Sequence, residues 1–310
     1  MHQKRLFPSF TLPFAVTALA VSVWAAAPEA EQRTFATPRE AARALLAAAE
    51  AQDLSALSAI FGKGADEILN SGDAVEDNNN VARFVKRATQ SLKERVDPAN
   101  PNHASFLIGP DNFPFPIPLV RTAGRWHFDT PSGKVEILAR RIGSNELDAI
   151  AACKAYVDAQ YDYATEDRNK NGIPEYARKL ISSPGKRDGL FWPGFDAPPT
   201  AFAEEVKRAK SEGSRKEGDK PTPYHGYYYR ILMSQGPKAR GGPMDYIQHG
   251  SMIGGFALVA WPAEHGVSGL KTFVVNQDGV IYEKDLGPST SAAAEAMTAF
   301  DPDSTWRRVR

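Results

Sequence analysis

The stretch whose residue types and spacing could do chemistry most directly is a polar loop in the middle of the chain, DRNKNG at residues 167–172. Its oxygen-bearing side chains occupy alternate positions and a glycine stands sixth, as in the first half of an EF-hand-type calcium loop. Alternating oxygens converge on a hard cation, and the glycine permits a sharp turn. The candidate calcium ligands are Asp167, Asn169, Asn171, the backbone carbonyl of Ile173, Glu175 and Asp188.

The rest of this loop departs from the calcium pattern. The twelfth position, where a bidentate glutamate is expected, holds Arg178. Asp188, in the sequence GKRDG, could complete a site if the loop folds back on itself. The alternative interpretation is a hydrogen-bonded turn, because Asp and Asn side chains readily satisfy nearby backbone groups. Calcium is the one cofactor that the sequence suggests, and both interpretations stay open at this point.

Histidines and carboxylates elsewhere could support acid–base chemistry. His127 and Asp129 alternate along a predicted strand and so share one face, which would matter if that face lined a pocket. The alternative places the intervening aromatic residues in the core and leaves the pair in solvent. His225, His249 and His265 each lie beside a glycine turn and could gather at one edge of a sheet.

A predicted amphipathic helix leads into the polar loop. Asn145 can cap its start, and Pro174 prevents its continuation beyond the loop. Apolar residues recur at three- to four-residue steps, which predicts one buried stripe on a helix that covers a sheet. A strand or extended connector is expected just before it, at residues 134–141. The stripe consists of Leu147, Ile150, Cys153 or Lys154, Val157, Tyr161 and Ala164.

The residues before this helix predict a first domain at 34–138. Thr37, Pro38 and Glu40 have the spacing of a helix cap, and further helical segments follow as far as residue 95. Strands are expected at 104–108, 115–122 and 125–129. Helices followed by strands predict an α+β arrangement, with N-terminal helices on a curved antiparallel sheet.

The last third of the chain predicts antiparallel strands, because β-branched and aromatic residues alternate with glycine turns. With the central helix packed on one face of this sheet, residues 139–310 would form a second, two-layer α+β domain. The expected strands are 225–233, 255–262, 271–276 and 280–284, and the expected helices are 201–209 and 292–300, the latter capped by Thr290.

Composition narrows the class of partner. The chain has 37 basic and 37 acidic residues, so no excess of charge favours nucleic acid or an anionic membrane. Cys153 is the only cysteine, which excludes an internal disulfide and a thiolate-rich metal site. An apolar fraction of 42% is enough to build packed cores.

The first 26 residues are typical of a secretory signal peptide. Lys4 and Arg5 precede an apolar run at residues 10–24, and small residues follow at the expected cleavage point. The run is short for a membrane span, and an uncleaved anchor is the alternative. We therefore expect an exported, periplasmic protein that has no transmembrane segment once the signal is removed.

Two partial resemblances imply a fold for each domain. The segments FATPREAARALLAAAEAQDLSALSAIFG and PLVRTAGRWHFDT resemble nuclear-transport-factor-like and SnoaL-like domains, which implies a cone-shaped α+β fold over residues 34–138. The helix GSNELDAIAACKAYVDAQYDYAT and the strands YYYRILM and GFALVAWPAEHGVSGLKTFVVNQDGVIY resemble the soluble heads of type IV pilins and pseudopilins. In pilins a continuous apolar helix precedes this head, whereas here a whole domain stands in that position.

A third resemblance covers almost the whole mature chain. It is to the bacterial domain-of-unknown-function family 2950, and it implies export but no particular activity. The phrases that carry it are DNNNVARFVKRA, NGIPEYARKLISSPGKRDGLFWP, GFALVAWPAEHG, TFVVNQDGVIYEKDLG and AFDPDSTW.

Two classes of function remain open. The first is a non-catalytic binding or assembly module whose partner is an envelope protein or polymer, and which calcium stabilises if the polar loop binds it. Tyr224 and Tyr227–Tyr229 could supply an aromatic interface for it. The second is a periplasmic hydrolase that acts on an envelope polymer through carboxylates and histidines. The sequence offers no paired nucleophile and base, no phosphate loop and no complete metal motif, which favours the first.

Overall fold

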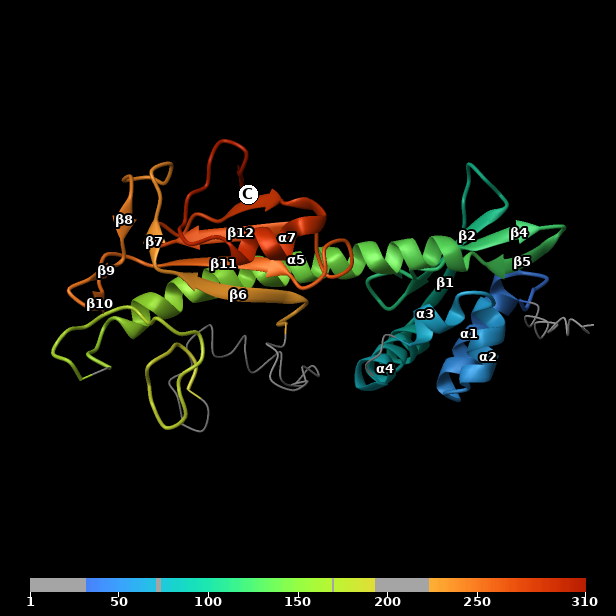
Figure 1. The fold of residues 1–310 in the computed structure, drawn as a ribbon. Helices are drawn as coiled ribbons and strands as arrows, with labels where there is room; N and C mark the ends of the chain where they lie inside the picture. The colour runs from blue at the N-terminus through green and yellow to red at the C-terminus, as the bar shows by residue number, and fades with distance from the viewer. Residues whose placement is uncertain (1–31, 71–73, 169, 193–222) are drawn as a thin grey trace, which may run out of the picture.

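The computed structural model describes residues 32–70, 74–168, 170–192 and 223–310, and it divides them between two lobes that one long helix joins (Figure 1). The signal peptide expected at residues 1–26 and the helix expected at 201–209 lie outside the described residues. Each lobe combines helices with an antiparallel sheet and has its own cluster of buried side chains. The fold class is α+β, as predicted.

The first lobe places helices on one antiparallel sheet whose strand order is β1-β2-β4-β5, with β3 paired to β2. Thr37 caps α1, since its side chain accepts a hydrogen bond from the Glu40 amide, and the Glu40 carboxylate in turn accepts one from the Ala36 amide. The elements are α1 (Pro38–Glu50), α2 (Leu54–Phe61), α3 (Ala65–Leu69), α4 (Ala74–Gln90), β1 (Leu92–Val96), β2 (His103–Ile108), β3 (Phe113–Pro114), β4 (Leu119–Thr122) and β5 (Arg125–Phe128).

Aromatic rings fill the core of this lobe. Phe128 is buried and packs edge-on against Phe35, Phe61 and Phe106 with ring centroids 5.4–6.5 Å apart. Such contacts add to the gain from burial alone, because the edge of one ring meets the face of another. Alanine, leucine and isoleucine side chains complete the core of the first lobe.

The connecting helix α5 (Thr130–Tyr163) is 34 residues long and begins earlier than the sequence analysis expected. Asp129 caps it by accepting a hydrogen bond from the Ser132 amide, and Pro131 fits its first turn. The predicted strand or connector at 134–141 is therefore wrong. Asn145 is not a cap but lies inside the helix, and the expected division between residues 138 and 139 also falls within it.

The buried face of α5 also differs from the predicted stripe. Leu147 is 70% exposed and Tyr161 is 48% exposed, although Cys153 and Val157 are buried as expected. Small alanines allow the helix to approach the sheet closely, and counting only large apolar residues overlooked them. The buried face from residue 149 onward consists of Ala149, Ala152, Cys153, Ala155, Tyr156, Val157, Ala159, Gln160 and Tyr163.

The second lobe is built on an antiparallel sheet with the strand order β14-β13-β12-β11-β6. Helix α5 packs on β11 and β12, and α7 packs on β11 as well. Every residue of β11 is buried, so both faces of the sheet are covered at this central strand. The elements are β6 (Tyr227–Leu232), β11 (Ala257–Pro262), β12 (Lys271–Asn276), β13 (Tyr282–Asp285), η1 (Gly287–Ser289), α7 (Thr290–Glu295) and β14 (Arg307–Arg308).

Two short strand pairs extend from the main sheet of the second lobe. They are β7 (Ser234–Gln235) with β8 (Met244–Asp245), and β9 (Ile247–Gln248) with β10 (Ser251–Met252). The tyrosines expected to form an interface are mainly core residues, since Tyr227 is fully buried and the Tyr229 hydroxyl is enclosed. No helix in the described ranges has the length and apolar character needed to span a membrane.

Candidate functional site

The polar loop that was predicted to bind calcium lies directly after α5 and is closed by its own side chains. The two carboxylate oxygens of Asp167 accept hydrogen bonds from the amides of Asn171 and Gly172, at 3.1 and 2.8 Å. Gly172 has a φ of +86°, a left-handed conformation that glycine adopts without strain. The glycine therefore does permit the sharp turn that the sequence pattern indicated.

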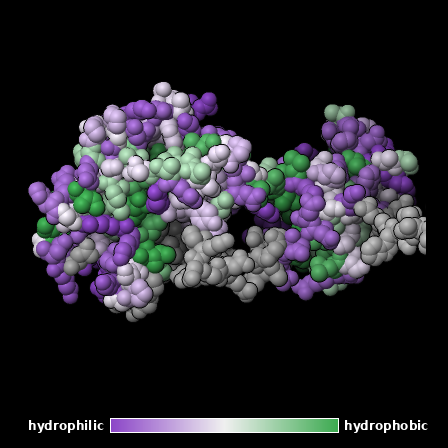
Figure 2. Space-filling model, in the orientation of Figure 1, coloured by the Kyte–Doolittle hydropathy of each residue, from purple (hydrophilic) through white to green (hydrophobic). Residues whose placement is uncertain are grey.

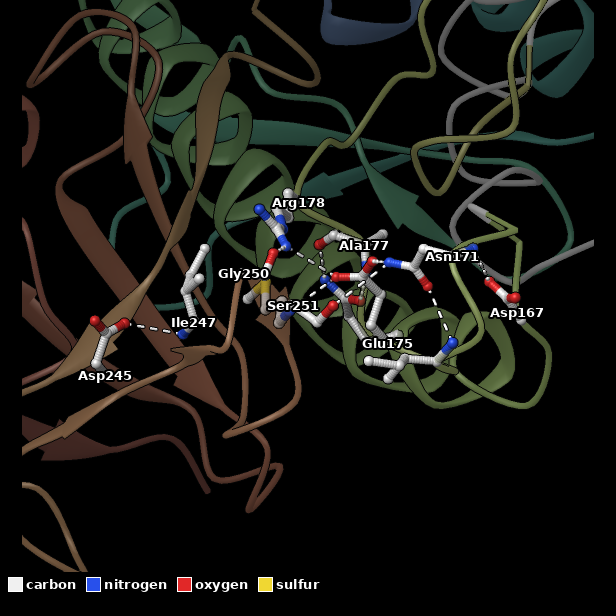
Figure 3. Close-up of polar contacts among 12 residues, drawn as sticks. Asp167, Asn171, Glu175, Ala177, Arg178, Asp245, Ile247, Gly250 and Ser251 are labelled. Carbon is white, nitrogen blue, oxygen red and sulfur yellow. Dashed lines mark hydrogen bonds and ion pairs between the residues drawn. The ribbon is translucent and has the colours of Figure 1, made fainter.

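Glu175 ties this loop to the strand pair β9–β10, as Figure 3 shows. Its side chain is only 4% exposed; one oxygen accepts from the Asn171 amide group at 3.0 Å, and the other from the Met252 amide at 2.8 Å. Arg178 pairs with the second oxygen at 3.0 Å and also donates to the Gly250 carbonyl. Glu175 is thus a buried carboxyl group that accepts hydrogen bonds from Asn171, Met252 and Arg178.

The structure brings some of the predicted calcium ligands together and separates others. Asp167, Asn171 and Glu175 form one continuous hydrogen-bonded chain, whereas Asn169 lies outside the described residues. The Ile173 amide donates to the Asn171 side chain at 3.0 Å, so this residue takes part in the loop through its N–H group.

Asp188 belongs to a different turn. Its carboxylate accepts hydrogen bonds from Lys179 at 2.8 Å and from the Ser183 amide at 2.8 Å. Burial raises the pKa of Asp188, but the hydrogen bonds from Lys179 and Ser183 outweigh it and lower this pKa to about 2. In the described parts of the chain, no three His, Cys, Asp or Glu side chains are grouped as metal ligands would be. The positive charge of Arg178 on Glu175 also opposes a cation at that carboxylate.

Gln160 anchors the loop on α5, a role that the sequence analysis missed. It is fully buried, its amide nitrogen donates to the Ala177 carbonyl at 2.9 Å, and its oxygen accepts from the Ala177 amide at 2.8 Å. The same nitrogen lies 3.0 Å from the Tyr156 hydroxyl, which donates to the Ala257 carbonyl. The available signal was a polar residue one turn from Tyr156 on the helix face that faces the sheet.

Two of the three candidate histidines occupy tight hairpin turns. His225 and Gly226 have φ values of +46° and +72°, and the residues on either side exchange backbone hydrogen bonds at 2.8 and 2.9 Å. His249 and Gly250 have φ values of +50° and +83° between β9 and β10. Positive φ at both central residues defines the type I′ turn that suits the twist of a hairpin. The His-Gly pairs therefore have a structural explanation.

The candidate histidines gather only in part. His225 lies 3.6 Å from Asp148 of α5, and His265 lies 2.9 Å from Asp285 of β13. Both are at the end of β11 near Pro262, since the Ala263 amide donates to the Gly226 carbonyl. His249, in the β9–β10 hairpin, precedes the other end of β11, so the three do not meet.

The aromatic residues that alternate with the His127–Asp129 pair lie in the core, as the alternative interpretation placed them, while the pair itself is half-buried. Trp126 and Phe128 are 5% and 1% exposed, so the aromatic face of β5 lies in the core. Asp129 caps α5 and also accepts from the Ser132 hydroxyl at 2.7 Å. Asp129 is therefore engaged as the helix cap.

A shallow depression open to solvent lies beside the strand pair β7–β8. Gln235 in its lining is 3% exposed, and its side chain donates to the Arg240 and Gly242 carbonyls and accepts from the Tyr246 hydroxyl. The lining residues are Met233, Ser234, Gln235, Pro243, Met244 and Asp245.

Comparison with known proteins identifies the family. The family model described as protein of unknown function, DUF2950, matches residues 32–309, so the chain belongs to that family, as its sequence suggested. No curated protein and no solved structure matches the chain. The resemblances of the two lobes to nuclear-transport-factor-like domains and to pilin heads therefore stay predictions.

Proposed function

We propose that this member of the family is an exported, non-catalytic binding or assembly module of the cell envelope, and that it meets its partner on apolar side chains at and beside Leu147 of α5. Leu147 is 70% exposed, and the residue before it, Glu146, is bonded to a loop that carries further exposed apolar side chains; this grouping carries the proposal. Exposed apolar groups on a well-ordered element mark interaction surfaces when they recur close together.

Further exposed apolar side chains lie on a loop of the second lobe that is bonded to Glu146, the residue before Leu147. Val267 and Leu270 are each 37% exposed, and their loop is fastened to α5 because Glu146 accepts hydrogen bonds from the Leu270 and Lys271 amides, both at 3.0 Å. Figure 2 shows a narrower region between the two lobes. The partner proposed for it is an envelope protein or polymer with an apolar face.

The test is capture of envelope components by the full chain and by matched variants. Leu147→Lys is expected to abolish capture, while Leu54→Lys, which changes a 62% exposed leucine on α2, should leave it unchanged. The proposal fails if the two variants capture the same components as the native chain. Fractionation of the producing cells tests export separately, since an exported protein is recovered outside the cytoplasm with its first residues removed.

Calcium is proposed as a stabiliser of the loop at Asp167. The support is the turn itself, because Asp167 and Gly172 adopt the arrangement that the sequence pattern predicts for a calcium loop. A cation that binds the folded state must raise the midpoint of thermal unfolding. An equal midpoint with added calcium and with EDTA would leave the loop as a hydrogen-bonded turn.

A hydrolase is the second candidate, and the two His–Asp pairs at one end of the second sheet favour it. An imidazole oriented by a carboxylate is the usual arrangement of a general base. If it acts on an envelope polymer, replacement of His265 or His225 by Ala must abolish polymer cleavage while the thermal midpoint is kept. Retention of cleavage in both variants would exclude this candidate.

A further inference from the structure

The middle of α5 crosses from one lobe to the other with little cover. On the side of the first lobe, Arg140 donates to the Pro114 carbonyl at 2.7 Å. On the side of the second lobe, the Asn145 side chain donates to the Ser268 carbonyl at 2.8 Å. Of the four residues between these anchors, 141–144, all but Ile142 are exposed. Solvent can therefore reach the backbone of the helix on most of its circumference here.

Gly143 in this stretch has no packing reason to be glycine. A Cβ atom added there would meet nothing within 4 Å, and its φ is not in the left-handed region. Gly133 lies on the part of the same helix that belongs to the first lobe, and its packing is different. A Cβ atom added there would lie 2.7 Å from the Ile117 side chain. What glycine does contribute at residue 143 is low helix propensity, since it loses the most backbone freedom on folding.

Ser144 adds to this local weakness. Serine hydroxyls compete for backbone carbonyls one turn back, and Gly–Ser pairs are among the recognised places where helices bend. Both residues are solvent-exposed, so water can replace helical hydrogen bonds that open there. The sequence Gly143-Ser144 thus places the weakest step of α5 midway between its two anchors.

The helix is held firmly on both sides of this step. In the first lobe, Gly133 packs against Ile117 and Lys134 pairs with Glu67. In the second lobe, Ala149 and Tyr156 have no exposed surface. Bending at Gly143 and Ser144 would leave these contacts intact, because both residues lie between them.

We propose that Gly143 and Ser144 form a hinge at which the two lobes swing relative to each other, so that the surfaces of the two lobes can meet a partner at more than one separation. The hinge is independent of the proposed envelope partner. It requires only that the helix is continuous, exposed and locally weak at one point. The motion is a bend of α5 with the interior of each lobe unchanged.

Pulsed electron–electron distance measurements on the full chain test this hinge. Glu50→Cys and Asp278→Cys place a spin label on an exposed position of each lobe, and Lys154→Cys with Asp278→Cys gives a control pair within the second lobe. Cys153 is fully buried, and burial raises the pKa of its thiol to about 12, so it does not react with the label.

The distribution of distances between the labels at Glu50→Cys and Asp278→Cys is expected to be broader than that of the control pair. Gly143→Ala should narrow it toward the control width, and Ala139→Gly, which adds a glycine one turn earlier, should broaden it. The hinge is overturned if the two native distributions have equal width, or if Gly143→Ala leaves the distribution between lobes unchanged. Since Gly143 is exposed and free of contacts, the alanine variant folds, and its narrowing is measured on an intact protein.

Discussion

The two halves of α5 are held in different ways, although they belong to one helix. The half in the second lobe buries small and aromatic side chains such as Ala149 and Tyr156 completely. The half in the first lobe is held mainly at its start, by the Asp129 cap, by Gly133 against Ile117, and by an ion pair between Lys134 and Glu67. Burial along a face fixes a helix more strongly than a cap and exposed pairs do.

The largest expected effect is in the half that is buried in the second lobe. Tyr156→Ala removes a fully buried ring that packs on Phe256 at 5.6 Å and should lower the free energy of unfolding by about 3–5 kcal/mol. Val135→Ala, in the exposed half, should change it by less than about 0.5 kcal/mol. Urea unfolding of both variants measures the contrast, and similar losses would mean that the halves do not differ.

The next effect concerns the buried carboxylate of the polar loop. Glu175→Ala leaves the Met252 amide without its acceptor, removes the ion pair to Arg178, and should cost about 2–3 kcal/mol. The control is Glu166→Ala, which breaks an ion pair to Arg168 on a 71% exposed carboxylate and should cost less than about 1 kcal/mol. If Glu175→Ala left the free energy of unfolding unchanged in chemical denaturation, the loop would not be fastened through this residue.

The cap at the start of α5 gives a smaller effect. Asp129→Ala removes the acceptor of the Ser132 amide and should lower stability by about 1 kcal/mol, whereas Asp129→Asn keeps a capping oxygen and should lose less. Circular dichroism monitored during thermal unfolding separates the two. Equal midpoints for both variants would argue against this cap.

Acid should destabilise the turn at Asp188 as the pH falls through the range between its ordinary and its lowered pKa. The pKa of this carboxyl is lowered to about 2, so its stabilising effect is present above its ordinary value near 4 and is lost as pH falls toward 2. Asp188→Asn should therefore make stability less dependent on pH between about 4 and 2. Unfolding midpoints of the native chain and of Asp188→Asn across this pH range test the prediction. If both midpoints changed with pH to the same extent, Asp188 would not be the cause.

Several features of the fold could be predicted because the signals were local. The Thr37 cap, the α+β class and the strands of the second sheet follow from short-range patterns that the structure keeps. The start of α5 could not be read as easily. Asp129 and Pro131 are a valid helix start, but Gly133 and the β-branched Val135 and Ile137 have low helix propensity. The packing of Gly133 against Ile117 overrides that preference. This contact joins two segments of the chain, so a pattern among neighbouring residues does not predict it.

The candidate site shows the same limit. The sequence correctly indicated a tight turn at Asp167 and Gly172, because the turn depends on neighbours in the chain. It could not indicate that Glu175 reaches Met252 or that Gln160 reaches Ala177, because these hydrogen bonds join separate elements. The His-Gly turns could have been identified as type I′ from sequence, had the pair been treated like Asn-Gly.

The central claim is that one continuous helix serves both lobes, and backbone ¹³Cα chemical shifts of residues 134–141 test it most directly. A helix moves these shifts above their random-coil values, whereas a strand or extended connector moves them below. The structure predicts positive deviations from Thr130 through Tyr163, weakest near Gly143. Negative deviations at residues 134–141 would contradict it.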